Sequence, residues 1–479
     1  MNIGIVFYFL GWVLGIEGIL MILPCVVALV YREPSGFYFL GVALFCGISG
    51  WLLAHRKLKS TVFYAKEGFV AVSLSWIVLS FFGALPFFLS GEIPLLEDAL
   101  FEVISGFTTT GASVLPDVEA LSRCMLMWRS FTHWIGGMGV LVFILAVLPL
   151  AGGYNIHIMR AESPGPSVGK LVPRVRTTAK ILYLIYLFIT VVQIILLLFT
   201  GMPLFDSMAM SFGTAGTGGF GIVNSSCGDY TSLQQWIFTI FMILFGVNFN
   251  VYYLFLIRKP KDALRCEEMR GYLGIILVST LLITWNIRGM FPDILTALKH
   301  AAFQVGSIIT TTGYSTTDFD LWPGFSRTIL VLLMFVGACA GSTGGGIKVS
   351  RIAIAVKTVN KELSSLIHPR NVKVLKYEGK AIEHNVLRSI NTYLVAYILI
   401  FSVSLLLISL DNFDLTTNFT AIAATLNNIG PGLSKVGPTC NFGIFSPISK
   451  YILMFDMLAG RLELFPMLLL FAPRTWMRE

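Results

Sequence analysis

The sequence is poor in charged residues. Asp, Glu, Lys and Arg make up only 13% of its 479 residues, whereas hydrophobic residues make up 56%. Soluble domains carry about 25% charged residues, so this composition excludes an ordinary soluble protein. Apolar runs long enough to cross a hydrocarbon core of about 30 Å recur along the whole chain. The composition therefore predicts an all-α polytopic protein that lies among membrane lipids.

Residue patterns that carry chemistry are also missing. The seven cysteines are scattered, with no CxxC pair and no metal-ligand spacing, which excludes a disulfide framework and zinc or redox chemistry. No Ser/His/Asp, Cys/His or paired-carboxylate arrangement suggests catalysis. We therefore expect a protein that is not an enzyme. The alternative of a membrane-embedded enzyme would need a convergent cluster of catalytic groups, and the sequence shows none.

The few charges are distributed unevenly between alternate loops. Lys and Arg exceed Asp and Glu in one set of loops, and the reverse holds in the opposite set. The basic set comprises residues 55–66, 160–180, 258–270, 351–388 and the C-terminal tail. The positive-inside rule makes this set cytoplasmic, with both termini inside. Orientation thus explains the basic balance, and nucleic acid is not an expected partner. An acidic outer face would concentrate cations.

The apolar runs form two leading helices followed by four similar units. The first run, 3–30, lacks a basic N-terminal region, is too long for a signal peptide and contains Glu17, so we expect a retained helix. The second is 36–54. Each unit has a long helix, a short amphipathic run and a second long helix. The expected ranges are 69–91, 96–107 and 125–149; 180–201, 204–213 and 233–257; 271–288, 294–309 and 327–357; and 389–410, 415–426 and 448–471.

A polar, glycine-bearing elbow ends every short run. The elbows read "TTTGAS" at 108–113, "GTAGTGGFG" at 213–221, "TTTGYS" at 310–315 and "NNIGPG" at 427–432. Aligned on Gly111, Gly218, Gly313 and Gly430, they lie 107, 95 and 117 residues apart. A period near 100 residues indicates an internal repeat. We divide the chain into leading helices at 1–60 and pore repeats at 61–155, 156–265, 266–360 and 361–479.

The short runs are too short to cross a membrane, so each should enter and return on the same side. Irregular backbone at membrane depth is tolerated only where it is buried or lines a water-filled cavity. Four such loops fit one arrangement, a pseudo-fourfold ring whose carbonyl groups replace part of an ion's hydration shell. The negative ends of the short helices would also face the ion. For any single elbow, the alternative is a tight turn or a small-residue packing contact.

These features resemble the Trk/Ktr/HKT superfamily of potassium transporters, and the resemblance covers essentially the whole chain. Further motifs that carry it are "GSTGGGIK" at 341–348 and "GRLELF" at 460–465. Two extra N-terminal helices favour the TrkH/TrkG branch over the shorter Ktr-type subunits. The resemblance implies ten transmembrane helices plus four pore loops. Potassium would be the transported ion, and no organic cofactor is expected in this chain.

The resemblance also implies which carbonyl groups bind potassium. They belong to Thr109, Thr110, Gly111, Gly216, Thr217, Gly218, Thr311, Thr312, Gly313, Asn428, Ile429 and Gly430. The T-V-G-Y-G sequence of potassium channels is absent, so we expect a short filter of moderate selectivity. It would pass potassium, rubidium and some sodium.

The glycine-rich segment 337–348 interrupts the second long helix of the third unit. Glycine at this density disfavours a helix by about 1 kcal/mol per residue. A phosphate loop is excluded because Ile347 separates Gly346 from Lys348. Small-residue helix packing is the alternative. The resemblance implies a gate across the pore, formed by Gly341, Gly344, Gly345, Gly346 and Lys348 together with Arg461.

Arg461 should lie near the middle of the membrane, where a charge is costly and indicates a functional role. Neither Glu463 nor Asp456 is a helical neighbour of it. An ion pair with another helix is one interpretation, and a cationic barrier under the filter is the one implied by the resemblance. The weaker candidates are Glu102 and Asp206, which could tune the field at the outer mouth, Lys299, interpreted as a surface anchor, and His133, interpreted as a packed or interfacial histidine.

By resemblance, the chain is a potassium uptake subunit of the bacterial cytoplasmic (inner) membrane. A TrkA-like cytosolic nucleotide-binding subunit would regulate it, and the chain would form a homodimer. The alternative function is a sodium- or proton-coupled secondary symporter. Such symporters usually have inverted repeats and broken midplane helices instead of four loops in the same sense.

Overall fold

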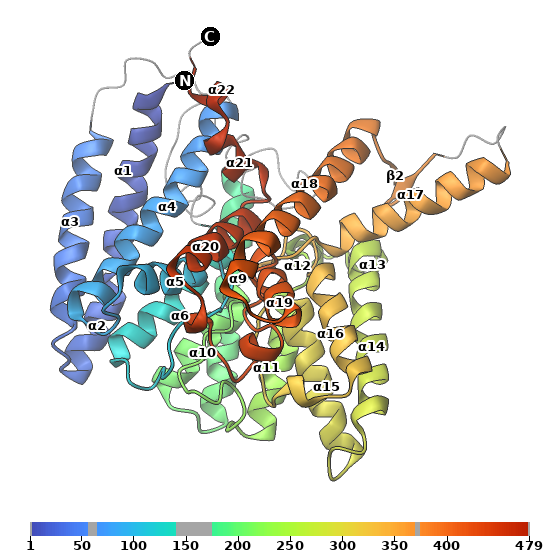
Figure 1. Ribbon diagram of the computed structural model, residues 1–479, viewed down its shortest axis with the longest axis horizontal. Coiled ribbons are helices and arrows are strands. Elements are labelled where there is room, and N and C mark those ends of the chain that lie inside the picture. Colours follow the sequence, from blue (N-terminus) through green and yellow to red (C-terminus); the bar gives the residue numbers. More distant parts are fainter. Residues whose placement is uncertain (1, 56–64, 140–174, 369–373, 478–479) are drawn as a thin grey trace.

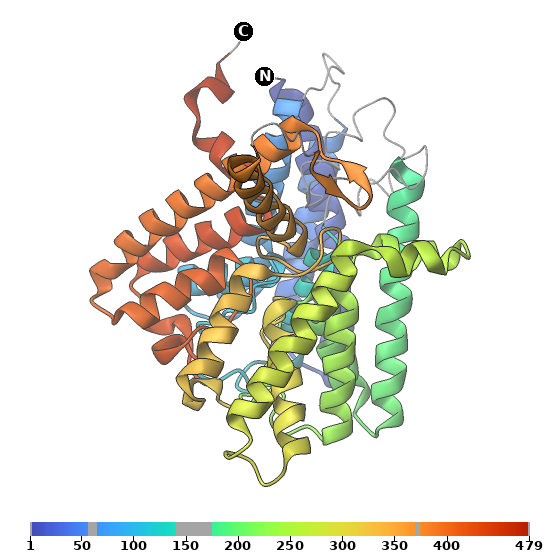
Figure 2. The same ribbon diagram turned by 90° about the vertical axis from the view of Figure 1, so that its right-hand side faces the viewer.

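The computed structural model describes residues 2–55, 65–139, 175–368 and 374–477. Regular structure in these ranges is helical apart from one antiparallel hairpin of two-residue strands, β1 (Lys376–Tyr377) and β2 (Lys380–Ala381). Both chain ends lie at the same end of the molecule, and the loops that follow the short helices lie at the opposite end (Figures 1 and 2). The all-α prediction is confirmed.

The leading segment forms α1 (Ile3–Leu20), α2 (Ile22–Tyr31) and α3 (Gly36–Ala54). The sequence predicts one helix over 3–30, and the structure has one span over Ile3–Tyr31, in which the single residue Met21 separates α1 from α2 and still donates its N–H to the Glu17 carbonyl. Helices α1 and α3 pack closely, since a Cβ on Gly11 or Gly50 would overlap backbone atoms of the other helix. Small residues allow such close approach between membrane helices.

The four predicted units follow. The first contains α4 (Ala65–Ser90), α5 (Leu96–Phe107) and α6 (Arg123–Gly137). The second contains α9 (Val175–Phe199), α10 (Leu204–Gly216), α11 (Ser232–Phe245) and α12 (Phe249–Leu256). The third contains α14 (Glu267–Ile287), α15 (Ile294–Ile309), α16 (Gly324–Val336) and α17 (Val349–Ile367). The fourth contains α18 (His384–Ile408), α19 (Leu415–Leu426), α20 (Pro447–Arg461) and α21 (Phe465–Phe471).

Shorter elements connect these helices. They are α13 (Pro260–Arg265), α22 (Pro473–Trp476), and the 3-10 turns η1 (Phe319–Leu321), η2 (Ser409–Asp411), η3 (Ser434–Val436) and η4 (Phe442–Ile444). Helix α17 projects from the body of the molecule with the hairpin beside it, at the end that carries the termini (Figure 1). The repeat boundaries at 60/61 and 155/156 lie outside the described residues, and the division into five parts stays a prediction.

The second long helices of the second and fourth units differ from the prediction. Helices α11 and α12 meet at an angle of 88°, so the expected helix 233–257 is bent and not straight. Helix α20 ends before α21, and Glu463 and Leu464 between them have φ of 60° and 65°. The continuous helix predicted over 448–471 is therefore wrong. The predicted break at 337–348 is confirmed, because α16 ends at Val336 and α17 begins at Val349. Of the predicted helix 125–149, residues 140–149 lie outside the described part.

These breaks lower the number of uninterrupted spans. In the described ranges, six helices are long and apolar enough to cross a membrane, or seven if the bent α11–α12 pair is one span. The six are Ile3–Tyr31, Gly36–Ala54, Lys66–Ser90, Ala179–Phe199, Glu267–Ile287 and His384–Asp411. The crossings expected over 233–257, 327–357 and 448–471 are made of shorter pieces, and most of the remainder of 125–149 lies outside the described residues.

The short helices α5, α10, α15 and α19 lie inside the bundle, and we call them the pore helices. Their C-terminal halves are almost completely buried, including polar residues such as Ser105, Ser211 and Ser307. Their N-terminal turns carry acidic residues or caps: Glu97 and Asp98 in α5, Asp206 in α10, Asp293 before α15 and Asp414 before α19. The carboxylates therefore lie at the positive ends of these helices, where they are favoured. Because the C-terminal halves are the buried ones, the negative ends of the helices point into the protein.

Candidate functional site

The four pore helices end in the same backbone turn. The residues in the left-handed region are Thr109 (φ 55°), Thr217 (φ 53°), Thr311 (φ 58°) and Asn428 (φ 57°). In each turn the next residue donates its N–H to the carbonyl five positions back: Thr110 to Ser105, Gly218 to Gly213, Thr312 to Ser307, and Ile429 to Ala424, at 2.8–2.9 Å. This is a Schellman cap, which usually uses glycine at the left-handed position.

Threonine is an unusual choice for that position. A β-branched residue at positive φ is a genuine outlier and costs about 1–2 kcal/mol. Three of the four units nevertheless place threonine there. Strain of this kind concentrates at functional sites, where the surroundings fix the backbone. The repeated strain therefore marks these turns as the candidate site.

The second unit requires a correction to the alignment. Two residues after the left-handed position, the chain again has positive φ at Gly111 (76°), Gly219 (79°), Gly313 (88°) and Gly430 (101°). The alignment on Gly218 is thus wrong by one residue, and Gly219 is the equivalent of Gly313. Gly216, which the sequence places among the ion-binding residues, is the last residue of α10.

Four close contacts close the turns into a ring. A Cβ on Gly111 would overlap the carbonyl oxygen of Gly218, one on Gly219 that of Thr312, and one on Gly313 that of Ile429. A Cβ on Gly430 would lie 2.8 Å from the carbonyl oxygen of Thr110. Each contact joins one unit to the next, and the last joins the fourth unit to the first. The four turns therefore surround a common axis.

Hydroxyl groups brace two of the turns. Thr108 Oγ1 lies 2.8 Å from Thr110 Oγ1 and donates to the carbonyl of Ile104 at 2.7 Å. In the third unit Thr310 Oγ1 lies 2.8 Å from Thr312 Oγ1 and donates to the Gly306 carbonyl. These local bonds hold the side chains against the pore helix. They fix the direction of the neighbouring backbone.

A cavity of about 80 Å³ lies on one side of the ring and one of about 110 Å³ on the other. The larger, which we call the mouth cavity, is lined by all four positive-φ glycines and by loop residues such as Asn224 and Cys440. Asn224 donates to Asp117 Oδ1 at 2.8 Å, and this hydrogen bond holds the pKa of the Asp117 carboxyl below its usual value. An ionised carboxylate thus lies beside the mouth cavity.

The glycine-rich segment 337–348, which we call the gate loop after the role that the sequence predicts for it, lies against the opposite side of the ring. Gly345 N–H donates to Thr311 Oγ1 at 2.6 Å, and a Cβ on Gly345 would lie 2.5 Å from the Asn427 carbonyl oxygen. The Thr343 hydroxyl donates to the Phe245 carbonyl at 3.2 Å. The loop thus contacts the second, third and fourth units directly. A segment that reaches all of these crosses the axis beneath the ring.

Arg461 connects the gate loop to the first unit. Its Nη1 donates to the Thr343 carbonyl at 2.9 Å, and its Nη2 donates to the carbonyls of Gly136 and Gly137, the latter at 2.8 Å. These carbonyls form the negative end of α6, which favours a cation. The nearby acid Glu463 pairs instead with Arg351. Arg461 thus contacts backbone carbonyls of the glycine-rich segment and of α6, and the ion pair considered for it stays a prediction.

The cavity of about 80 Å³ lies where these groups meet. It is lined by gate-loop residues from Gly341 to Lys348, by Gly137 to Gly139, and by residues 460–463. Lys348 is 2% exposed, and its ammonium group donates to the Gly344 carbonyl. The structure therefore brings together all the residues that the sequence assigned to the gate.

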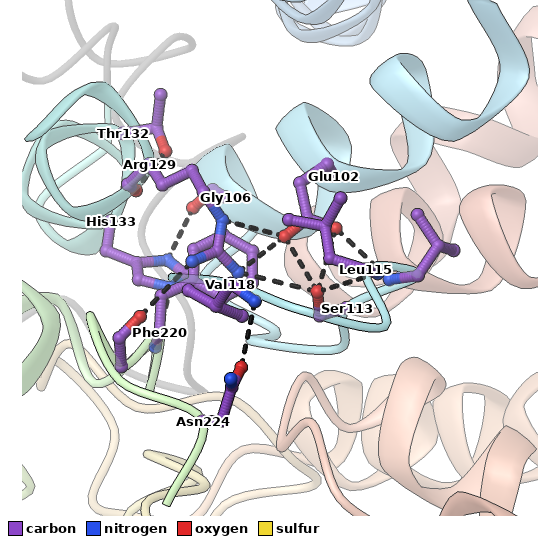
Figure 3. Close-up of polar contacts among 12 residues, drawn as sticks. Glu102, Gly106, Ser113, Leu115, Val118, Arg129, Thr132, His133, Phe220 and Asn224 are labelled. Carbon is purple, nitrogen blue, oxygen red and sulfur yellow. Dashed lines mark hydrogen bonds and ion pairs between the residues drawn. The ribbon is translucent and has the colours of Figure 1, made fainter. Parts of the chain in front are cut away.

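Sequence reasoning missed the partner of Glu102. Glu102 is fully buried and pairs with Arg129 at 2.5 Å (Figure 3). Arg129 Nη1 also donates to the Gly221 carbonyl at 3.2 Å. The Arg129 guanidinium lies 3.9 Å from the centre of the Phe220 ring. The partners of Glu102, Arg129 and Ser113, line the mouth cavity, and the interpretation of Glu102 as a group that tunes the outer field stays a prediction. The pair ties the first pore helix to the second filter turn.

His133 supports the same junction. Its Nε2 accepts from the Phe220 backbone N–H at 3.2 Å, so Nδ1 carries the proton and donates to the Gly106 carbonyl at 2.8 Å (Figure 3). The ring is fully buried. The prediction of a packed histidine is confirmed, and its two hydrogen bonds fix a neutral tautomer.

Glu268 is a second residue that the sequence did not single out. Its Oε1 accepts from the N–H groups of Ala340, near the start of the gate loop, at 2.7 Å and of Ser350, in the first turn of α17 just after the loop, at 3.2 Å. Its own N–H donates to Glu378 in the hairpin at 3.0 Å. Because these residues are distant in the sequence, no local pattern indicates the contact. Glu268 therefore holds both ends of the loop against the start of α14.

Long apolar helices surround four re-entrant turns that close into a ring, which defines a polytopic membrane protein built around a pseudo-fourfold pore. The chain matches the TrkH family, described as "Cation transport protein", over residues 36–287 and 290–477. It is 40% identical to the Trk system potassium uptake protein TrkH of Salmonella typhimurium over 469 residues, which cover 95% of each chain. It is 34% identical to TrkG of Escherichia coli over 484 residues, 99% of each chain.

A solved structure shows the same fold. The crystal structure of the potassium transporter TrkH from Vibrio parahaemolyticus matches with a TM-score of 0.89 and 33% sequence identity, covering 100% of both chains. The chain belongs to the TrkH family. The resemblance inferred from the elbows is thereby confirmed, and the protein is an integral membrane protein of the kind described for that family.

Proposed function

We propose that this protein takes up potassium ions across the bacterial inner membrane through the ring of four turns. Its relatives are named as potassium uptake proteins of the Trk system and cover nearly the whole chain. The observation that carries the proposal is the closed succession of glycine-to-carbonyl contacts between the four units. Such a ring supplies backbone oxygens from every side of one axis.

We propose that the carbonyl groups in these turns replace the hydration shell of the ion. In the second unit the assignment moves by one residue to Thr217, Gly218 and Gly219. The other units keep Thr109, Thr110 and Gly111; Thr311, Thr312 and Gly313; and Asn428, Ile429 and Gly430. Potassium is the transported substrate here, not a resident cofactor.

The gate loop and Arg461 would close the pathway on the side opposite the mouth cavity. The loop crosses beneath the ring, and Arg461 holds it to the carbonyls at the end of α6. A guanidinium at this depth opposes a cation that leaves the ring, since both carry positive charge. Opening then requires the loop to move away from the axis.

The orientation and the partners are further parts of the proposal. The ends of the chain lie on one side, and the basic loops assign that side to the cytoplasm. Helix α17 projects there, with exposed side chains such as Leu366 and Ile367. This arm would give a TrkA-like nucleotide-binding subunit access to the helix that continues the gate loop. A homodimer with one pathway per chain completes the proposed assembly.

Rubidium flux into proteoliposomes tests the function. Purified protein is reconstituted with and without a membrane potential, and separately with a proton or a sodium gradient. A conducting pore predicts that flux follows the potential alone, with rubidium favoured over sodium. Strict dependence on a proton or sodium gradient would establish a coupled symporter and contradict the proposal.

A further inference from the structure

The four left-handed residues of the ring differ in what their side chains contact. Thr311 Oγ1 accepts the Gly345 N–H of the gate loop at 2.6 Å. Thr217 Oγ1 donates to the carbonyl of Gly216, and Asn428 Nδ2 donates to Thr110 Oγ1 and the Met457 carbonyl. Thr109 Oγ1 has no hydrogen-bond partner among the described residues. Of these four positions, Thr311 alone accepts a bond from the gate loop within the described ranges.

The surroundings of Gly345 leave its N–H few alternatives. Gly345 is buried, and the space beside its Cα is filled by the Asn427 carbonyl and the Asn428 side chain. A Cβ on the neighbouring Gly344 would lie 2.9 Å from the Thr310 carbonyl oxygen. Loss of the Thr311 acceptor would therefore leave a buried N–H group unsatisfied while the loop stays in this position. In an open position, water would satisfy the same group.

We infer that Thr311 is a positioning residue that clamps the gate loop to the filter. Its backbone forms the third turn of the ring, and its hydroxyl holds the loop closed through Gly345. The inference rests on the proposed function, since it assumes that the loop closes the pathway. The inference adds a coupling between gate and filter. Opening of the loop would break the hydrogen bond from Gly345 to Thr311, and Thr311 also forms part of the filter.

The pseudo-fourfold repeat provides a matched control. Thr109 occupies the equivalent position in the first unit, with nearly the same φ, but its hydroxyl makes no hydrogen bond to the gate loop among the described residues. Thr311→Val and Thr109→Val make the same isosteric change, since each replaces a hydroxyl by a methyl group. Thr311→Ser keeps the acceptor. Comparing these variants separates the loss of the clamp from a general disturbance of the ring.

Hydrogen–deuterium exchange of the full chain in lipid nanodiscs measures the clamp. We expect exchange in the peptide covering 337–348 to become about tenfold faster in Thr311→Val, because a buried N–H has lost its acceptor. Thr311→Ser should restore the wild-type rate, and Thr109→Val should leave the loop rate unchanged. If Thr311→Val does not fold, Thr311→Ala removes the same acceptor without the β-branch. Unchanged loop exchange in the folded variant, or equal acceleration in Thr109→Val, would overturn the inference.

Flux separates failure of the clamp from failure of the proposed function. If the loop is the gate, Thr311→Val should also raise rubidium flux measured without a partner subunit. Faster loop exchange with unchanged flux would overturn the link between the clamp and the gate. The proposed function fails by a different result, namely wild-type protein that passes no rubidium under a membrane potential, and the exchange measurement does not depend on that outcome.

Discussion

Gly313 packs so closely on the carbonyl oxygen of Ile429 that no side chain fits between them. A Cβ on Gly313 would come closer than the 3.0 Å that real Cβ atoms keep, and Gly313 has φ of 88°. The same relationship joins the other three pairs of neighbouring turns. Glycine is thus required at these positions by both backbone conformation and space. The width of the ring depends on these contacts.

Replacement of Gly313 tests that dependence. Gly313→Ala adds about 1–2 kcal/mol of backbone strain and a clash with the Ile429 carbonyl, so the ring must widen or distort. We expect the rubidium-to-sodium flux ratio to fall by several-fold in protein that still purifies as a folded species. Gly274→Ala is the control, since a Cβ there meets nothing within 4 Å. An unchanged ratio in Gly313→Ala would count against the filter assignment.

The Glu102–Arg129 pair gives a prediction for stability. Glu102→Gln leaves the buried Arg129 without its charged partner, and breaking a buried pair costs about 3–5 kcal/mol. We expect a clear fall in the thermal unfolding temperature of purified protein. Lys357→Ala is the comparison, because the Lys357–Glu267 pair is partly exposed and such pairs contribute about 0–1 kcal/mol. Equal shifts for the two variants would show that the buried pair contributes little.

Arg461 offers a test of the barrier. Arg461→Ala removes both the positive charge and the bonds to the Thr343 and Gly137 carbonyls, so we expect rubidium flux without a partner to increase. Arg461→Lys keeps the positive charge, but a lysine ammonium lacks the two separated N–H groups with which the planar guanidinium bonds the Thr343 and Gly137 carbonyls. Its rubidium flux should therefore rise less than that of Arg461→Ala. A folded Arg461→Ala protein with unchanged or lower flux would contradict the barrier. Misfolding of both variants would show a structural role instead.

Cys440 allows the mouth cavity to be probed chemically. It is the exposed member of the seven free cysteines and lines the mouth cavity. A membrane-impermeant, positively charged thiol reagent should reduce rubidium flux when it is applied on the side opposite the chain ends. Cys440→Ser should abolish the effect. Inhibition from the side of the termini would reverse the proposed orientation, and persistence in Cys440→Ser would assign the effect to another residue.

Much of the fold could be predicted because the repeat is visible in the lengths of the apolar runs. The pore helices α5, α15 and α19 match the short runs expected at 96–107, 294–309 and 415–426. The breaks inside the second long helices were harder to predict from the sequence. At Glu463 and Leu464 a local signal was present but was not used: Pro466 lies in the first turn of α21 and has no backbone N–H to donate to the Leu462 carbonyl, so a continuous helix is disfavoured there. The glycine-rich break at 337–348 was predictable because glycine disfavours a helix.

In the site too, local sequence motifs could be predicted, whereas contacts between residues distant in the sequence could not. Glycine elbows located all four turns, but "GTGG" contains two consecutive candidates, and only the backbone angles identify Gly219. Glu102 and Arg129 lie on different helices, so the sequence offered each as an isolated charge. Glu268 and Ala340 are equally distant in sequence. Such contacts are set by tertiary packing and leave no local pattern.

Direct observation of the ion tests the central claim most sharply. Crystals grown with rubidium give anomalous scattering that locates the ion. The account predicts a peak on the ring axis, surrounded by the carbonyl oxygens of Thr110, Gly218, Thr312 and Ile429. A rubidium peak bound elsewhere, with none inside this ring in protein that transports rubidium, would contradict it.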